Sequence, residues 1–249
     1  MANILDRYGI KEVADVTFYE VTSAGTPGAP VLFLDTLKVS TIEQTAENAE
    51  ARGGKGNAAL ISWDYGKEIT VTLEDALYSA KSLAMMFGDV DSEGRPAPAI
   101  ESTSLCKTVR YDASTMSSLE AGESIAIEVN GNSITLNSCV IYDANGSSVT
   151  AGDSAAYVTG VFTPTTAMVI DVSANAFPGN YYITGDTYAR SETTGKDEFF
   201  QFIIPKAKVM SESNTITLEA EGDPTVFTMS LKVLRPADGK MMKLVQYTI

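Results

Sequence analysis

The residues whose types and spacing come closest to a chemical site lie at positions 89–94. Asp89, Asp91 and Glu93 stand at the first, third and fifth positions of an EF-hand-like calcium loop, and Gly94 stands at the sixth. The twelfth position is Ile100, where such a loop needs a bidentate glutamate, and two prolines interrupt the segment. We therefore interpret this segment as a solvated turn, and the sequence predicts neither a metal site nor a cofactor.

The other candidates for chemistry are also incomplete. Residues 52–56 are glycine-rich and basic, but they lack the Ser or Thr after the lysine, and the following helix, that a phosphate-binding Walker A loop requires. Cys106 and Cys139 have no CxxC spacing, so neither a disulfide framework nor a zinc site is indicated. The chain contains no histidine, which removes the commonest general base and every Ser-His triad. Because the carboxylates are scattered and suggest no glycosidase pair, we expect a protein that is not an enzyme.

Charge and hydropathy limit the partners further. The 249 residues include 18 Lys and Arg against 32 Asp and Glu, so the net charge is −14. Tight nucleic-acid binding needs clustered basic residues, and the sequence has no such cluster. The longest apolar run, at 29–34, is far shorter than the roughly 18 residues that cross a bilayer, so no membrane segment is expected. Hydrophobic residues make up 44%, which is typical of a folded globular chain.

The first part of the chain, 1–108, predicts strands, a long loop and one helix. Strands are expected over 13–21, 31–39, 59–65 and 67–73. Residues 40–58 are polar and have no apolar period, and loops longer than about 12 to 15 residues are usually functional or disordered. We therefore expect a long loop there that acts as a contact arm. A helix is expected over 73–87, with Thr72 as its N-cap and Gly88 at its C-terminal stop.

The middle of the chain, 109–190, predicts a small all-β insert. Residues 125–129 and 133–136 are apolar and β-branched, and Asn130-Gly131 between them indicates a hairpin with a type I′ turn. Further short strands are expected over 139–142, 156–162, 168–172 and 181–188. Tyr181, Tyr182 and Tyr188 could form a sugar-binding platform, although aromatic residues in strands more often pack within the sheet. The closing part, 191–249, predicts strands over 198–204, 206–210, 215–220, 225–234 and 241–248.

Several phrases of the sequence resemble bacteriophage tail tube proteins, also called major tail proteins. These phrases are, in order, residues 35–40 (DTLKVS), 51–57 (ARGGKGN), 63–77 (WDYGKEITVTLEDAL), 204–208 (IPKAK), 220–224 (AEGDP) and 231–234 (LKVL). The resemblance covers roughly 10–95 and 195–249. It does not extend over the middle of the chain, which looks like a decorating domain.

The resemblance implies a mainly β fold, a tail-tube-like β-sandwich or barrel with one flanking helix. It also implies that subunits form six-membered rings whose strands join into a continuous inner barrel, and that rings stack into a tube through which DNA passes without specific binding. The residues themselves agree with parts of this expectation. Closing a ring removes exposed sheet edges, and a head-to-tail contact between rings gives an open filament. A negatively charged bore would repel the DNA backbone.

The resemblance further implies that the long loop reaches a neighbouring subunit or ring. On this basis we expect the subunit interface to include Glu43, Glu47, Arg52, Gly53, Gly54, Lys55, Gly56 and Asn57, with Leu77, Tyr78 and Lys81 of the helix at or near a subunit boundary. The implied partners are further copies of the chain and other tail proteins: a sheath if the tail is contractile, the tape measure, the baseplate or tip, and the terminator. The implied location is the phage virion tail, assembled in the host bacterial cytoplasm.

Two other interpretations remain open at this point. The chain could be another virion component of the same fold, from the baseplate, the collar or the completed head. It could also be a carbohydrate-binding β-sandwich adhesin.

Overall fold

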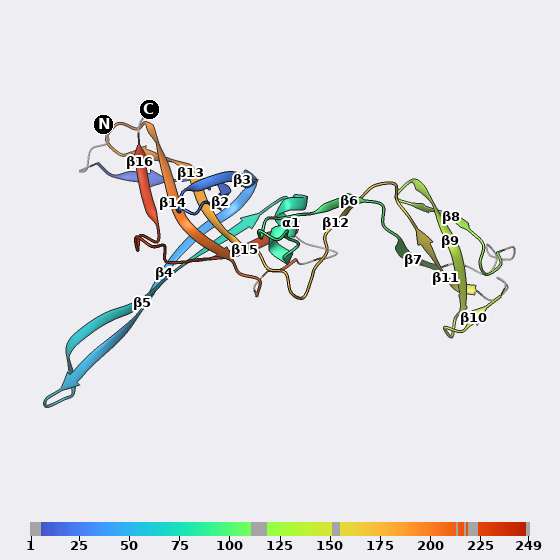
Figure 1. Ribbon diagram of the computed structural model, residues 1–249, viewed down its shortest axis with the longest axis horizontal. Helices are drawn as coiled ribbons and strands as arrows, with labels where there is room; N and C mark the ends of the chain where they lie inside the picture. The colour runs from blue at the N-terminus through green and yellow to red at the C-terminus, as the bar shows by residue number, and fades with distance from the viewer. Residues whose placement is uncertain are drawn as a thin grey trace. The chain divides into compact units, whose positions relative to one another are not determined.

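The structure is a computed structural model that describes residues 6–110, 119–150, 155–212, 214–216, 218 and 224–247. The fold is mainly β and sandwich-like, as expected from the sequence, with antiparallel strands and one helix in the described part of the chain (Figure 1). The chain divides into two compact units. The first comprises Met1–Pro98 and Ile170–Ile249, and the second comprises Ala99–Val169.

The elements follow one another along the chain as labelled in Figure 1. They are β1 (Tyr8–Ile10), β2 (Asp15–Val21), β3 (Pro27–Leu34), β4 (Leu37–Gly53), β5 (Ala58–Asp75), α1 (Ala80–Phe87), β6 (Ala99–Glu101), β7 (Leu105–Arg110), β8 (Ile125–Val129), β9 (Asn132–Asp143), β10 (Ser148–Val149), β11 (Ala155–Phe162), β12 (Ala167–Val169), β13 (Asn180–Ser191), β14 (Asp197–Val209), β15 (Phe227–Val233) and β16 (Lys243–Tyr247).

The first unit contains a nine-stranded sheet in the order β3-β2-β13-β14-β15-β5-β4, with β1 paired to β13 and β16 paired to β14. Ile183 on β13 lies between Phe18 on β2 and Ile204 on β14. All three side chains are fully buried. The core therefore lies on one face of this sheet, where every second residue of each strand points inward. β13 lies at the centre of this sheet, although the sequence assigned residues 181–188 to the insert.

The helix α1 packs its central residues into the same core, including Leu83, Met85 and Met86. Ser79 caps it, because its side chain accepts a hydrogen bond from the backbone N–H of Ser82. Gly88 ends it in the left-handed conformation, as the sequence predicted.

The predicted helix start at 73 is wrong. Residues up to Asp75 continue β5, where Val71, Leu73 and Asp75 are buried at every second position. Leu73 and Leu77 share a helical spacing, but Leu73 also fits the strand period of two, and pairing with β15 at Met229 favours the strand. Local helix spacing is a weak signal when sheet pairing competes for the same residues.

The predicted loop over 40–58 is also wrong, because this segment forms most of a long antiparallel hairpin. β4 and β5 pair from Leu37 opposite Asp75 to Gly53 opposite Ala58, with register shifts at three places along the hairpin. The prediction relied on the absence of an apolar alternation in residues 40–58. A strand that exposes both faces needs no such alternation, so its sequence resembles that of a loop.

In the second unit, a five-stranded sheet runs in the order β10-β9-β11-β7, with β8 paired to β9. Its own core contains Leu136, Ile141 and Val158, all fully buried. The predicted hairpin between 125–129 and 133–136 is confirmed: Asn130 and Gly131 both have positive φ, as a type I′ turn requires.

Towards the C-terminus, the two strands expected over 198–204 and 206–210 form the single strand β14. Its register against β13 shifts between Ile204 and Ala207, around Pro205, which cannot donate a ladder hydrogen bond. The strands expected over 225–234 and 241–248 correspond to β15 and β16. The strand expected over 215–220 falls partly outside the described residues, and within it Thr215 forms an isolated bridge with Thr228.

The second unit should be removable without unfolding the first. Its two connections lie together, because Ala99 on β6 pairs with Val169 on β12. The buried core of the first unit contains no residue from 99–169. We expect a chain that joins Pro98 to Ile170 by an Asn-Gly turn to keep a cooperative thermal transition in circular dichroism. A chain that is unfolded at room temperature would contradict this division.

Candidate assembly interface

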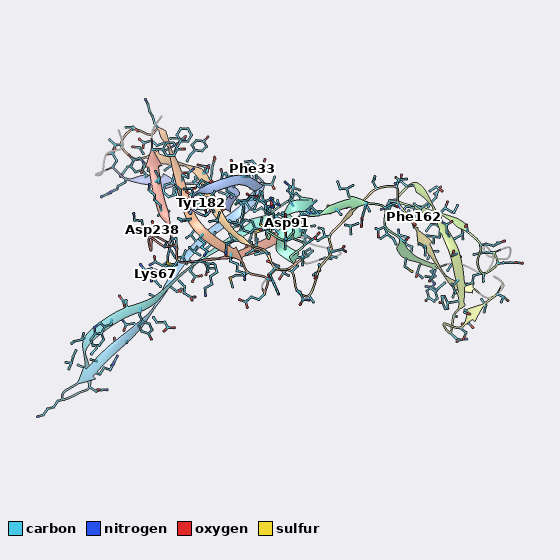
Figure 2. The ribbon with its side chains drawn as sticks, viewed as in Figure 1. Phe33, Lys67, Asp91, Phe162, Tyr182 and Asp238 are labelled. Atoms are coloured by element: carbon cyan, nitrogen blue, oxygen red, sulfur yellow. The ribbon has the colours of Figure 1, made fainter. Side chains whose placement is uncertain are left out.

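The most unusual feature of the first unit is the two-stranded ribbon formed by the outer parts of β4 and β5, residues 43–68. The side chain of Ile69 is buried, but every residue from 54 to 68 is exposed, as are 43–50 on the partner strand. In Figure 2, Lys67 marks the region where the ribbon leaves the sheet, and its side chains stand clear of the rest of the first unit. An isolated two-stranded hairpin is at best marginally stable in water, so a ribbon of this length indicates a contact with another molecule.

The tip of the ribbon is a tight turn built by glycine. Gly54, Gly56 and Asn57 all have positive φ, and the Asn57 N–H donates to the Gly54 carbonyl at 3.2 Å. Glycine adopts this conformation at no steric cost, which explains the composition of 53–57. Lys55 is exposed at this turn. The tip is therefore a short structural turn and not a phosphate-binding loop followed by a helix.

One face of the ribbon is apolar. Tyr65, Trp63 and Ile61 alternate along β5 and therefore project on the same side, and their exposed fractions are 53%, 53% and 54%. On β4, Ala49 and Ala51 pair with Trp63 and Ile61 and are too small to cover them, and Glu47 pairs with Tyr65. Exposed large apolar side chains gathered in one row mark interaction sites in soluble proteins.

The opposite face of the ribbon is polar and internally bonded. The Asn48 amide donates to Asp64 Oδ1 at 2.8 Å and also reaches the Ser62 hydroxyl. Arg52 Nε donates to Glu50 Oε2 at 2.8 Å. Such exposed pairs contribute little stability. The polar side chains of this face already have hydrogen-bond partners and can remain in water. We therefore expect the contact with another molecule on the apolar face.

Eight of the residues expected at the subunit interface lie along the ribbon, from its base to its tip. Glu43, Glu47, Arg52 and Gly53 lie on β4, and residues 54–57 form the turn. The sequence interpretation missed Ile61, Trp63 and Tyr65. Their alternation was visible as a strand signal, but nothing in the alternation alone says that the strand projects beyond the core.

The other expected interface residues lie at the far end of β5 from the tip. Leu77 and Tyr78 follow β5 and are 64% and 54% exposed, and Lys81 is an exposed residue of α1. The Tyr78 ring packs against Phe227, with centroids 5.0 Å apart. Leu77 and Tyr78 therefore form an exposed apolar surface that is separate from the ribbon.

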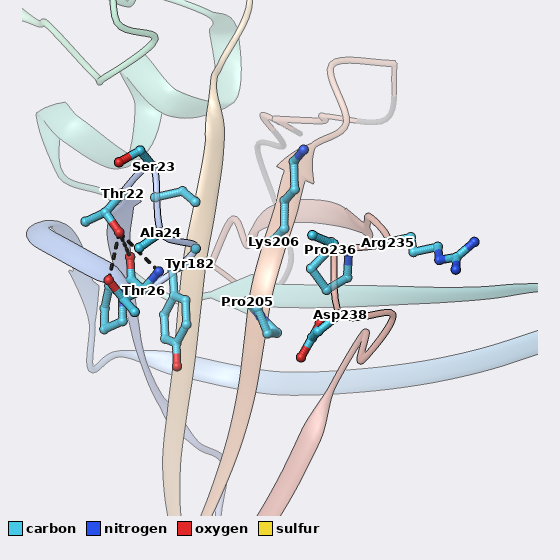
Figure 3. Close-up of a pocket in the computed structure, with 14 residues that line it drawn as sticks. Thr22, Ser23, Ala24, Thr26, Tyr182, Pro205, Lys206, Arg235, Pro236 and Asp238 are labelled. Atoms are coloured by element: carbon cyan, nitrogen blue, oxygen red, sulfur yellow. Dashed lines mark hydrogen bonds between the residues drawn. The ribbon is translucent and has the colours of Figure 1, made fainter.

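A hollow of about 580 Å³ lies where the β2–β3 turn meets β13, β14 and the segment after β15 (Figure 3). Its polar groups do not converge on one point. The Thr22 and Thr26 hydroxyls bond to each other at 2.7 Å, and the charged ends of Lys206 and Arg235 point in different directions. The hollow therefore shows no arrangement that suits one particular ligand.

The acidic segment at 89–94 is a turn held by Arg95. The backbone N–H of Arg95 donates to Asp91 Oδ1 at 3.0 Å, and its guanidinium bonds the other oxygen at 2.7 Å. The pKa of Asp91 is lowered mainly by the backbone hydrogen bond from Arg95. Within the described residues no group of three or more His, Cys, Asp or Glu side chains could hold a metal ion. The same part of the chain contains no helix long and apolar enough to span a membrane.

Tyr181 ties this turn to the sheet and predicts a pH dependence of stability. Its hydroxyl donates to the Gly94 carbonyl, and burial raises its pKa to about 12. In the unfolded chain a tyrosine ionises near pH 10. The unfolded state therefore loses a proton first, so the free energy of unfolding should fall as the pH rises from about 10 to about 12.

Urea unfolding at increasing pH measures this effect. The decline above about pH 10 should be shallower in Tyr181→Phe than in the wild type, because the variant lacks the ionising group. If the free energy of unfolding falls equally in both proteins above about pH 10, ionisation of Tyr181 does not cause the fall.

The model of one protein family, described as the YomU/Tube protein family, matches residues 8–246. The match covers nearly the whole chain, including the second unit. No curated protein matches the sequence.

Proposed function

Because this chain belongs to the YomU/Tube protein family, a phage tube-like structural protein family, we propose that it is the subunit of a phage tail tube. In this proposal six copies form a ring, the rings stack head to tail, and the bore conducts DNA during delivery. The protein works by assembly and catalyses no reaction. It resides in the virion tail after assembly in the host cytoplasm and contacts other tail proteins such as the tape measure and the tip.

The ribbon at 43–68 is the observation that carries this proposal. It extends from a well-packed sheet with both faces exposed, and one face presents Ile61, Trp63 and Tyr65. A monomer gains nothing from this arrangement, since the ribbon buries no core surface of its own. A subunit that contacts identical neighbours gains a repeated contact from it.

The charge of the chain supports a conduit for DNA. A ring of six would carry six times the net charge of −14 of a single chain. Any part of this charge that faces the bore repels phosphate, so DNA can slide without being held.

Light scattering over a concentration series tests the proposal. The wild-type chain should form particles whose mass rises far beyond a single ring. A matched variant that replaces residues 45–68 by a two-residue Asn-Gly turn, between the paired residues Gln44 and Ile69, should stay small, because the sheet it retains lacks the ribbon. Equal assembly by both chains would show that the ribbon is not the contact arm.

A further inference from the structure

β5 contains two runs of alternating apolar residues, and both fall on odd-numbered positions. Ile61, Trp63 and Tyr65 lie in the ribbon, and Ile69, Val71 and Leu73 lie in the sheet. In a regular strand, residues at even separations share one face, so all six would project to the same side. The ribbon's apolar face would then continue the face that covers this chain's own core.

The pairing with β4 shows that the two runs project to opposite faces. Val71 and Ile69 pair with Ile42 and Gln44, at even positions of β4. Tyr65 and Trp63 pair with Glu47 and Ala49, at odd positions. Because directly paired residues share a face, the apolar face of the ribbon continues the side of the sheet that points away from the core.

A β-bulge causes this change of face. Between the pairs Thr45–Glu68 and Glu47–Tyr65, β5 contains one residue more than β4. Gly66 lies in this interval with φ 62°. A bulge with a glycine in the left-handed conformation inserts one unpaired residue and shifts the alternation that follows. A Cβ on residue 66 would have room, with Glu47 Cγ 3.8 Å away, so the backbone conformation and not crowding selects glycine.

The ion pair at the base of the ribbon confirms which side is the outer one. Glu68 pairs with Thr45 just below the bulge, and its carboxylate bonds Lys232 Nζ on β15 at 2.8 Å. Lys232 alternates with the buried Leu231 and therefore projects away from the core. Glu47, on the same face of β4 as Thr45, lies beside the apolar row.

We propose that the Gly66 bulge directs the apolar face of the ribbon to the outer side of the sheet, where a second copy of this chain covers it. This inference rests on the proposed self-assembly and specifies which face takes part. The core-side face of the ribbon, with Asn48, Ser62 and Asp64, stays in water.

The proposed assembly from identical subunits favours a second copy as the occupant, because every copy carries the same uncovered row. From Ala58 to Tyr65 the face is roughly 26 Å long and roughly 10 Å wide, or about 260 Å². A stable contact between two different proteins usually buries about 800 Å² on each side. The row is therefore one part of a larger contact, and in a head-to-tail assembly each copy both gives and receives a ribbon. The carboxylate of the neighbouring Glu47 disfavours nucleic acid as the occupant, because it repels phosphate.

Insertion of one threonine between Ala46 and Glu47 tests the proposal, with Gly66→Asn as the matched control. The inserted residue gives β4 the residue that it lacks opposite Gly66, so both strands alternate regularly and Trp63 turns to the core-side face. Asparagine at position 66 retains the bulge and tolerates positive φ better than other side chains. The concentration at half-assembly should rise by about tenfold or more in the insertion variant and stay within about threefold in Gly66→Asn, since tenfold reflects about 1.4 kcal/mol of contact energy. The thermal transition of the core should be unchanged in both.

Trp63 provides an independent readout, because it is the only tryptophan of the chain. Its emission should shift to the blue, and acrylamide should quench it less, when the wild-type chain assembles. Assembly with an unchanged Trp63 signal, or equal assembly by the insertion variant, would overturn this inference and leave the tube function standing. A wild-type chain that does not assemble at any concentration would overturn both.

Discussion

A chain with Ile61→Thr, Trp63→Thr and Tyr65→Thr should remain monomeric at concentrations at which the wild type assembles. Burying one large apolar side chain contributes about 1.5 to 3 kcal/mol. These three are already about half covered, so roughly half of that sum, about 2 to 4.5 kcal/mol, is available to the contact. This difference corresponds to a rise of roughly thirtyfold to two-thousandfold in the concentration that assembly needs. Analytical ultracentrifugation measures it directly.

The control changes the same number of residues on the other face of the ribbon. Asn48→Thr, Ser62→Thr and Asp64→Thr remove the polar bonds there, and threonine retains β-propensity in both variants. This control should assemble like the wild type, and both variants should keep the thermal stability of the core. If the control loses assembly as completely as the first variant, the ribbon acts through its rigidity and not through its apolar face.

Gly185→Ala should destabilise the first unit more than any change on the ribbon. Gly185 on β13 pairs with Phe202 on β14, whose ring lies over the glycine. A Cβ at position 185 would lie 2.1 Å from two ring carbons of Phe202, and that ring is 3% exposed and enclosed by the core. Overpacking of this kind costs roughly 2 to 3 kcal/mol. In a chain of this size that lowers the melting temperature by roughly 4 to 10 °C.

Gly9→Ala is the matched control for this change. Gly9 lies on β1, which pairs with the same strand β13, and a Cβ there would meet nothing within 4 Å. Differential scanning calorimetry should show a clear loss for Gly185→Ala and almost none for Gly9→Ala. Equal melting temperatures for the two variants would mean that the Phe202 ring moves aside freely, contrary to the packing described above.

Sequence reasoning succeeded where a local signal determines local structure. Asn130-Gly131 specifies the turn between β8 and β9, since both residues adopt positive φ. Gly88 ends α1 for the same conformational reason. The resemblance to tail tube proteins agrees with the family match, and the mainly β, sandwich-like fold follows from both.

Sequence reasoning failed where tertiary pairing or exposure overrides the pattern. Residues up to Asp75 have a helix-like spacing, but pairing with β15 keeps them in β5. Residues 40–58 resemble a loop because an exposed ribbon needs no apolar alternation. The site itself was expected from the resemblance at Glu43, Glu47 and 52–57. The sequence could not assign its apolar row to a face of the sheet. The apolar residues of β5 occupy odd-numbered positions in both the ribbon and the sheet, and only the strand pairing reveals the Gly66 bulge between them.

Cryo-electron microscopy of the concentrated wild-type chain tests the central claim most directly. The account predicts stacked rings of six subunits in which the ribbon of each copy lies against a neighbour, with Ile61, Trp63 and Tyr65 covered by that neighbour. Closed two-fold dimers, or assemblies in which the ribbons extend uncovered into solvent, would contradict it.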